Sequence, residues 1–127
     1  MNQQTHIKEL QVTISITEET IENIMSALLE DEKWSIHQDD DQSNWSNKPL
    51  GIYQDEWATN LLLHGEMLML TDKRNKNSLY SMTLEDLYDG IFFSLKGGNS
   101  SLFQNVTNET ADTIIQYSIF KRLLYLS

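Results

Sequence analysis

The pattern of apolar and polar residues predicts a strand followed by a helix in the first part of the chain. In the segment 8–16, apolar residues occupy every second position, as expected for a half-buried strand; they are Leu10, Val12, Ile14 and Ile16. Thr17 suits an N-cap, and Glu18 and Glu19 follow in the first turn, where the helix dipole favours anions. Apolar residues at helical spacing then continue to about residue 30.

The central part of the chain predicts a short strand, a second helix and a hairpin. The segment 34–36 alternates between apolar and polar residues, as in a strand. A helical stretch starts near Asp55 and stops at Gly65. The segments 66–72 and 78–82 flank the basic turn KRNKN, which predicts an antiparallel hairpin.

Two more helices are predicted in the last third of the chain. Thr83 is the expected N-cap of the first one, and Gly97 and Gly98 mark its end. Its apolar stripe consists of Leu84, Leu87, Tyr88, Ile91, Phe92 and Leu95. The last helix starts near Glu109 and is apolar on almost every side through Leu124, which predicts a central position or docking on a partner.

These elements predict one α+β domain in which a small antiparallel sheet packs with about four helices. The predicted order is β-α-β-α-β-β-α-α. A length of 127 residues fits one domain, with residues 1–7 as a flexible polar tail and residues 8–127 as the domain.

The composition narrows the class of protein. The chain has no cysteine, which excludes disulfides and thiolate metal sites. Its first residues contain no apolar run, and its apolar stretches are short, so we expect neither a signal peptide nor a transmembrane helix. The sequence therefore predicts a soluble cytoplasmic protein.

The formal net charge of −10 is unevenly distributed. Residues 1–66 contain thirteen acidic and three basic residues, whereas residues 67–127 contain six of each. An acidic first half repels nucleic acids and anionic membranes and favours a basic partner. We therefore expect a protein partner with a basic surface, no direct contact with nucleic acid and no membrane binding.

The most acidic segment, HQDDDQSNWSN at residues 37–47, does not match the sequence of a calcium-binding loop. An EF-hand counted from Asp39 needs glycine at its sixth position and glutamate at its twelfth, but these are Asn44 and Leu50. Counting from Asp41 also fails. The segment is interpreted as a solvated acidic loop that can contribute to an interface, with a loose cation contact as the alternative.

No constellation of residues predicts an enzyme. The histidines, His6, His37 and His64, are far apart and lack the spacing of metal ligands. The carboxylates of the third helix, Glu85, Asp86 and Asp89, are off its apolar stripe and are expected to be exposed, with nearly ordinary pKa values. Nucleophile elbows and phosphate-binding loops are also missing. The sequence predicts no catalytic residue, metal or cofactor.

The aromatic residues of the acidic half allow two interpretations. Trp34 and Trp57 are expected in the core, and Trp45, in the polar loop, is expected to be exposed. Alternatively, Trp34, Tyr53 and Trp57 form a pocket for a cationic or stacked ligand.

The predicted contact surface combines the first helix with the acidic loop. It consists of Glu18, Glu19, Glu22, Asp39, Asp40, Asp41 and Trp45. Such a face suits a basic partner, and one special form would imitate the phosphates of duplex nucleic acid. The plain alternative is a solubilising surface.

Four segments in chain order carry a familiar pattern of core residues: ITEETIENIMSALLED, GEMLMLTD, SMTLEDLYDGI and ETADTIIQYSIF. The pattern covers most of the chain and resembles a group of small proteins encoded by phages and other mobile elements of gut-type bacteria. The resemblance implies this genomic setting, and it implies no activity and no site residues.

The function expected from these observations is that of a non-enzymatic acidic accessory protein of a phage or mobile element. It would bind a host or defence macromolecule through its acidic face. The alternatives are a small-ligand (nucleotide-like) binding protein or sponge with an aromatic pocket, and a structural protein of unknown role. The apolar end of the last helix also predicts a possible homodimer.

Overall fold

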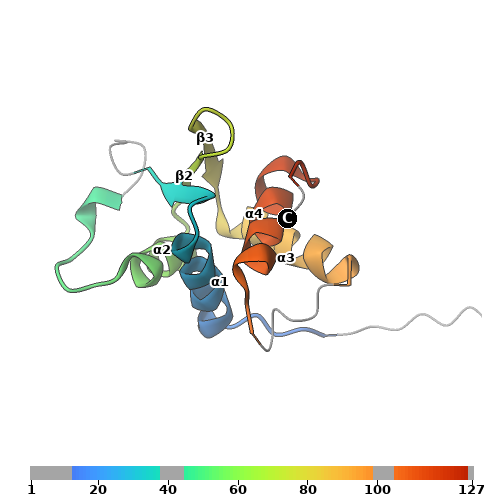
Figure 1. The fold of residues 1–127 in the computed structure, drawn as a ribbon. Helices are drawn as coiled ribbons and strands as arrows, with labels where there is room; N and C mark the ends of the chain where they lie inside the picture. The colour runs from blue at the N-terminus through green and yellow to red at the C-terminus, as the bar shows by residue number, and fades with distance from the viewer. Residues whose placement is uncertain (1–12, 38–44, 99–104, 126–127) are drawn as a thin grey trace, which may run out of the picture.

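The computed structural model of the chain describes residues 13–37, 45–98 and 105–125, which form four α-helices and a three-stranded antiparallel sheet (Figure 1). The helices are α1 (Glu18–Glu30), α2 (Gln54–Leu63), α3 (Leu84–Lys96) and α4 (Asn108–Phe120), with a short 3-10 turn, η1 (Trp45–Asn47). The strands are β1 (Trp34–Ile36), β2 (Leu68–Asp72) and β3 (Ser78–Met82). The predicted α+β class and most of the predicted order are confirmed.

The predicted first strand differs from the structure in the part that is described. Residues 13–16 have no regular secondary structure, and Ile14 is 44% exposed. Only Ile16 of this segment packs against the core, directly before the Thr17 cap. The rest of the predicted strand and the tail 1–7 lie outside the described residues.

Helix α1 forms for the reasons that its sequence suggests. Thr17 accepts a hydrogen bond from the Thr20 backbone N–H, and Thr20 caps Thr17 in return, which satisfies N–H groups that a helix start leaves unpaired. Its buried face consists of Ile21, Ile24, Met25, Ala27 and Leu28. The helix therefore presents one apolar face to the core and one polar face outward.

The sheet is built around β2, which pairs with β1 on one side and β3 on the other. In the antiparallel register, Trp34 is opposite Asp72, and Leu68 is opposite Met82. The predicted hairpin is confirmed. The predicted end of α2 is also confirmed, because His64 is its C-cap and Gly65 follows with a left-handed φ of 82°.

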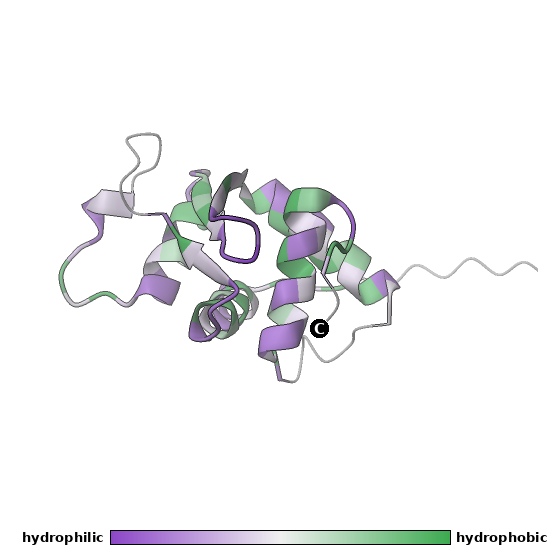
Figure 2. Ribbon diagram, turned by 45° about the horizontal axis from the view of Figure 1, so that its top comes forward, coloured by the Kyte–Doolittle hydropathy of each residue, from purple (hydrophilic) through white to green (hydrophobic). Residues whose placement is uncertain are grey.

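Helix α4 is central, as predicted, since it packs against α3, α1 and β3 (Figure 1). It is less apolar than predicted, and Figure 2 shows hydrophilic positions alternating with hydrophobic ones along it. Its buried polar residues are Thr110, Asp112, Gln116 and Ser118. The helix stops at Phe120 because Lys121 adopts a left-handed conformation, with a φ of 63°. Leu123 and Leu124 follow outside the helix, and the homodimer stays a prediction.

The buried face of α3 is rotated relative to the predicted stripe. Phe92 is 59% exposed, whereas Gly90 and Ser94 are buried. The reason is the close approach of α4: a Cβ atom on Gly90 would lie 2.0 Å from the Ser118 Oγ and 2.4 Å from the Ile114 carbonyl oxygen. Small residues replace the expected aromatic residue at this contact between the two helices.

Within the described ranges, no helix combines the length and the apolar character that crossing a membrane requires.

The close contact at Gly90 predicts that Gly90→Ala destabilises the fold. Because the backbone of α4 has to move, we expect the free energy of unfolding to fall by about 1–3 kcal/mol, despite the better helix propensity of alanine. Urea denaturation measures this loss. Gly97→Ala is the matched control, because its Cβ would meet only carbonyl oxygens at 3.5 Å. Equal stability of Gly90→Ala and the wild type would contradict the close contact.

Candidate functional site

The first candidate site is a buried polar network around Asp112 of α4. The Asp112 carboxylate accepts two hydrogen bonds from the Arg74 guanidinium, at 2.6 and 3.0 Å. It also accepts the Trp34 indole N–H at 2.8 Å and the Gln116 amide at 3.0 Å. Asp112 is 2% exposed, so these donors replace the water that a carboxylate needs. One side chain thereby connects α4 with β1 and with the turn after β2.

The network continues to the C-terminal segment through Tyr125. The Tyr125 hydroxyl donates to the Asp72 carboxylate at 2.7 Å, and its ring lies 4.0 Å from the Arg74 guanidinium carbon. The Gln116 side chain accepts the backbone N–H groups of Leu124 and Tyr125. The hydrogen bond to Asp72, together with burial, raises the pKa of Tyr125 to about 12, so its hydroxyl remains a donor at neutral pH.

The polar groups of this network bind to other groups within the protein. Its carboxylates accept hydrogen bonds from side chains and a backbone N–H of the protein. The Arg74 Nε, which is buried without a hydrogen bond, lies 3.8 Å from Asp72. A general acid or base must reach a substrate proton. These groups instead face their partners inside the protein. The network therefore anchors the C-terminal segment to the sheet.

We predict that Asp112→Ala strongly destabilises the protein. The substitution leaves the guanidinium of Arg74 partly buried without its main partner, and breaking such a pair costs about 3–5 kcal/mol. Thermal or urea denaturation measures the loss. The control is Asp89→Ala on the exposed side of α3, where the 3.8 Å contact with Lys121 is expected to contribute less than about 1 kcal/mol. A mild effect at Asp112 would show that the network is not needed for stability.

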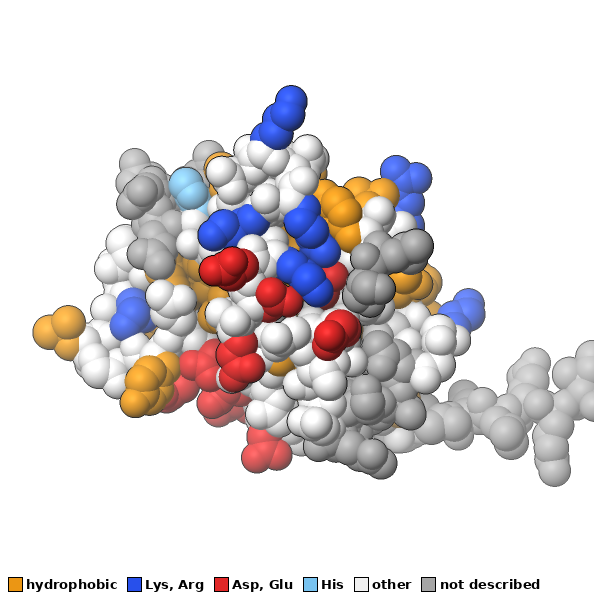
Figure 3. All heavy atoms as spheres, in the orientation of Figure 1, with side chains coloured by type: hydrophobic (Ala, Val, Ile, Leu, Met, Phe, Trp, Pro, Cys, Tyr) orange, Lys and Arg blue, Asp and Glu red, His pale blue; other side chains and the backbone are white. Residues whose placement is uncertain are grey.

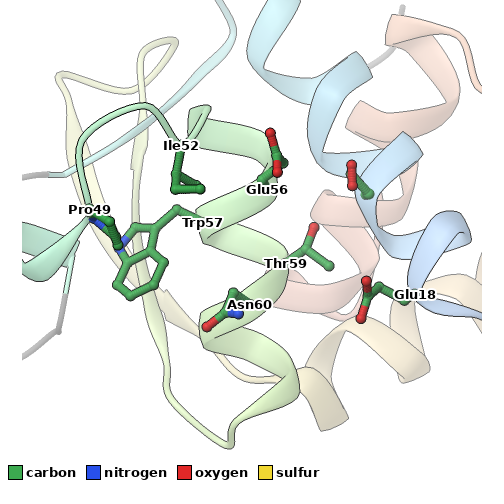
Figure 4. A pocket seen from close by; sticks show the side chains of 8 residues that line it. Glu18, Pro49, Ile52, Glu56, Trp57, Thr59 and Asn60 are labelled. Carbon is green, nitrogen blue, oxygen red and sulfur yellow. The ribbon is translucent and has the colours of Figure 1, made fainter.

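The second candidate site is a cavity of about 230 Å³ between α1 and α2. Its lining comes from α1, from the segment before α2 and from α2 itself: Glu18 and Glu22, Pro49 and Ile52, and Glu56, Trp57, Thr59 and Asn60. Figure 4 shows Glu56 and Thr59 of α2 on the side toward Glu18 of α1, with Pro49, Ile52 and Trp57 together at the far end. The cavity therefore contains carboxylates as well as a group of apolar side chains at its far end.

A second hollow, of about 300 Å³, continues along the same helix. It is lined by Ser26, Leu29 and Glu30 of α1 and by Tyr53, Gln54 and Asp55 at the start of α2. Glu18, Glu22, Ser26 and Glu30 are four residues apart, so they form one stripe on the surface of α1. The two hollows therefore follow one stripe, and we call them together the acidic groove.

The segment before α2 is held in place by tryptophan. The Trp57 indole N–H donates to the backbone carbonyl of Trp45 at 3.2 Å. Trp45 itself is 5% exposed and belongs to the core. Beyond this anchor, Leu50 is fully exposed and Tyr53 is 75% exposed. The segment therefore places two apolar side chains in solvent next to the acidic groove.

The electrostatics of the acidic groove are repulsive. Burial raises the pKa of the Glu22 carboxyl above its ordinary value of 4.5, and neighbouring carboxylates raise it further. These neighbours are Asp55, Glu56, Glu18 and Glu19. Carboxylates from both helices are therefore close enough to repel one another, and a cation placed among them would relieve the repulsion.

Three of the described basic side chains form ion pairs, and none of their acidic partners lines the groove. The ion pairs join Lys33 to Asp31, Arg74 to Asp72 and Asp112, and Lys121 to Asp86 and Asp89. On the face shown in Figure 3, acidic side chains extend over the lower part of the molecule, and most lysine and arginine side chains lie above them. The carboxylates of the groove therefore take part in none of these ion pairs, and Lys48, in the segment before α2, donates to the backbone carbonyl of Ile52.

The residues of the predicted contact surface do not all lie at one site in the structure. Glu18 and Glu22 line the acidic groove, and Glu19 is exposed on the same helix. Asp39, Asp40 and Asp41 lie outside the described residues. Trp45 contradicts the prediction of an exposed aromatic residue, because its ring packs in the core beside α2. The sequence missed this because burial of a loop residue depends on which helix it meets.

The predicted aromatic pocket is only partly assembled. Trp34 is 2% exposed and bound to Asp112, so it belongs to the core, as the first of the two interpretations predicted. Trp57 is half-buried and packs against the core, but it also lines the groove together with Tyr53 in the neighbouring hollow. Two of the three aromatic residues therefore lie along the acidic groove.

Among the described residues, the other candidate carboxylates and histidines form no site, and His6 lies outside these residues. Asp86 differs from its prediction: burial raises its pKa, but hydrogen bonds from Thr83 and the charge of Lys121 outweigh burial and lower the pKa below its ordinary value. His64 contacts the Asn60 carbonyl at the end of α2, as its predicted place at a helix end suggests. Within the described ranges, no three histidine or acidic side chains are arranged to hold a metal ion.

Sequence reasoning missed the α2 side of the groove. Asp55 and Glu56 were visible as acids in the first turn of a helix, where they are common for reasons of helix stability. Their importance arises from the packing of α2 beside α1, which the one-dimensional pattern does not specify. The sequence signal was the apolar residues that come shortly before these acids, Leu50, Ile52 and Tyr53, in a segment that contains proline and glycine.

In comparisons with known proteins, no family model matches the chain, and neither a curated protein nor a solved structure shows significant similarity to it. The class that the fold and the site define is therefore that of a small α+β protein with an acidic groove between two helices. The resemblance to mobile-element proteins stays a prediction.

The repulsion at Glu22 predicts that Glu22→Gln stabilises the protein at pH 7, by about 0.5 kcal/mol or less. A carboxyl whose pKa is raised by folding binds more protons in the folded state. The wild type therefore loses stability as pH rises from 4.5 through the folded pKa of Glu22. Urea denaturation across this pH range measures the difference, which is expected to shrink in high salt.

The control is Glu85→Gln, which removes an exposed charge in the first turn of α3 and is expected to give no gain. A Glu22→Gln variant that is no more stable than the wild type at pH 7 would contradict the repulsion.

Proposed function

We propose that this protein is a non-enzymatic binding protein that captures a protein with a basic surface through the acidic groove. The observation that supports this proposal is the gathering of carboxylates from α1 and α2 around Glu22 while the described ion pairs lie elsewhere. Acidic surfaces speed the approach of basic partners and select against acidic ones.

Exposed apolar residues beside the groove support a protein partner. Tyr53 lines the second hollow together with Asp55 and is 75% exposed, and Leu50 is fully exposed in the same segment. Tyrosine is among the residues that contribute most to protein interfaces. A nucleotide-like ligand is a weaker candidate, because its phosphates would meet Glu18, Glu22 and Glu56 in the same cavity.

The resemblance to mobile-element proteins suggests where the partner is found. We propose a host or defence protein of the bacterium, and in this setting the chain acts as an accessory protein that occupies the basic surface of its target. The acidic loop with Asp39, Asp40 and Asp41 is proposed to add to the same interaction.

A charge-reversal experiment tests this proposal. The wild type and the double variant Glu22→Lys/Glu56→Lys are each immobilised and exposed to host lysate, and captured proteins are quantified by mass spectrometry. We expect the variant to lose the proteins that the wild type captures, with at least about a tenfold drop, because two reversed charges turn attraction into repulsion.

The control for this experiment is Glu85→Lys/Glu109→Lys, which has the same net charge but changes exposed acids of α3 and α4. It is expected to capture the partner as the wild type does. An equal loss in both double variants would mean that total charge matters and the groove does not. Circular dichroism verifies that both variants are folded.

A further inference from the structure

The length of the acidic groove matches one helix of a partner protein. Its α1 stripe runs from Glu18 to Glu30, which corresponds to about 18 Å along the helix axis at 1.5 Å per residue. A partner helix of about three turns has the same length. An occupant of this length can contact both hollows at once, whereas a single side chain can contact only one.

The walls of the groove favour a helix over an extended strand. Both walls are formed largely by α1 and α2, and no strand of the sheet lines the groove. An extended segment in this groove would therefore find no strand edge with which to pair its backbone along its length. A helix satisfies its backbone internally and presents side chains alone.

The chemistry of the groove specifies the faces of that helix. Carboxylates occur in both hollows, from Glu22 and Glu56 in one and from Glu30 and Asp55 in the other. Apolar surface lies along the side formed by Ile52, Tyr53 and Trp57. The complementary helix has basic residues facing α1 and apolar residues facing the segment before α2.

We propose that the acidic groove is a docking site for a basic amphipathic helix of about three turns, supplied by the partner protein. This inference rests on the proposed function and specifies the element of the partner that is recognised. Lysine or arginine residues of the docked helix reach the carboxylates of both hollows, and its apolar residues cover the exposed ring of Tyr53. Charge complementarity selects this occupant, because a second copy of this chain would bring its own acidic groove.

Two synthetic peptides of equal composition test the docking site. Both contain the same leucine, lysine and alanine residues, but only one arranges its leucines at positions i, i+4, i+7 and i+11, so that they share a helix face. The other has a shuffled order without an apolar face. Each is titrated into the full-length isotope-labelled protein, with affinity measured by fluorescence anisotropy and the contact surface mapped by NMR.

We expect the patterned peptide to bind at least about tenfold more tightly than the shuffled one, because only it offers both faces to the groove. The amide signals of Glu22, Ser26 and Asn60 should shift on binding. Equal affinity for the two peptides would reduce the interaction to charge attraction and overturn the docking site. Absence of binding by both peptides, or shifts confined to another surface, would overturn it as well.

A matched pair of variants adds a second readout. Tyr53→Ala is expected to weaken binding of the patterned peptide at least about fivefold, since truncating an interface aromatic residue typically removes more than about 1 kcal/mol. Tyr53 is the N-cap of α2 but makes no side-chain capping hydrogen bond, so the variant keeps the helix start. Phe92→Ala, which truncates an exposed ring on α3, is expected to bind normally.

The docking site and the proposed function can fail separately. If the charge-reversed groove variant loses its cellular partner while the two peptides bind alike, the acidic face is a binding surface and the recognised element is not an amphipathic helix. If the patterned peptide binds at the groove as described, the docking site is supported even before the cellular partner is known.

Discussion

The buried carboxylate of Asp112 is the interaction on which the rest of the structure depends. It binds a cation from the turn after β2, an indole N–H from β1 and an amide from its own helix. A carboxylate without these donors would not be stable in the core, so its burial requires that strand, turn and helix come together in one arrangement. Gln116, one turn further along α4, extends the same requirement to the C-terminal segment.

The pairing of charges in the second half of the chain explains why the first half stays acidic. Arg74 forms ion pairs with Asp72 and Asp112, and Lys121 forms ion pairs with Asp86 and Asp89. These bases therefore do not neutralise the carboxylates around Glu22. The uneven charge of the sequence is kept in space because the ion pairs of Arg74 and Lys121 are formed with acids of the second half of the chain.

Elements that depend on local physics could be predicted from the sequence. The caps at Thr17 and Thr83, the hairpin around KRNKN and the apolar face of α1 follow from hydrogen bonding and periodicity within a few residues. The pairing of Arg74 with Asp112 joins residues 38 positions apart, and the sequence around either residue does not indicate this pairing. Trp45 was predicted to be exposed and Phe92 to lie on the buried face of its helix. Both predictions are wrong for the same reason, because the burial of each residue depends on which neighbour packs against it.

The candidate site was predicted in part. Glu18 and Glu22 were expected on the acidic face of the first helix, and both line the groove. The opposing wall came from α2 and from the segment before it, which reach α1 only through tertiary packing. The hollow forms only where α1 and α2 pack side by side, and the sequence of one helix does not indicate which other element packs against it.

The network around Asp112 and the acidic groove have no residue in common. The groove carboxylates are therefore open to evolutionary change, because replacing one of them leaves the network around Asp112 intact. A lineage that has to follow a changing target can exchange these residues one at a time, and each intermediate remains a folded protein.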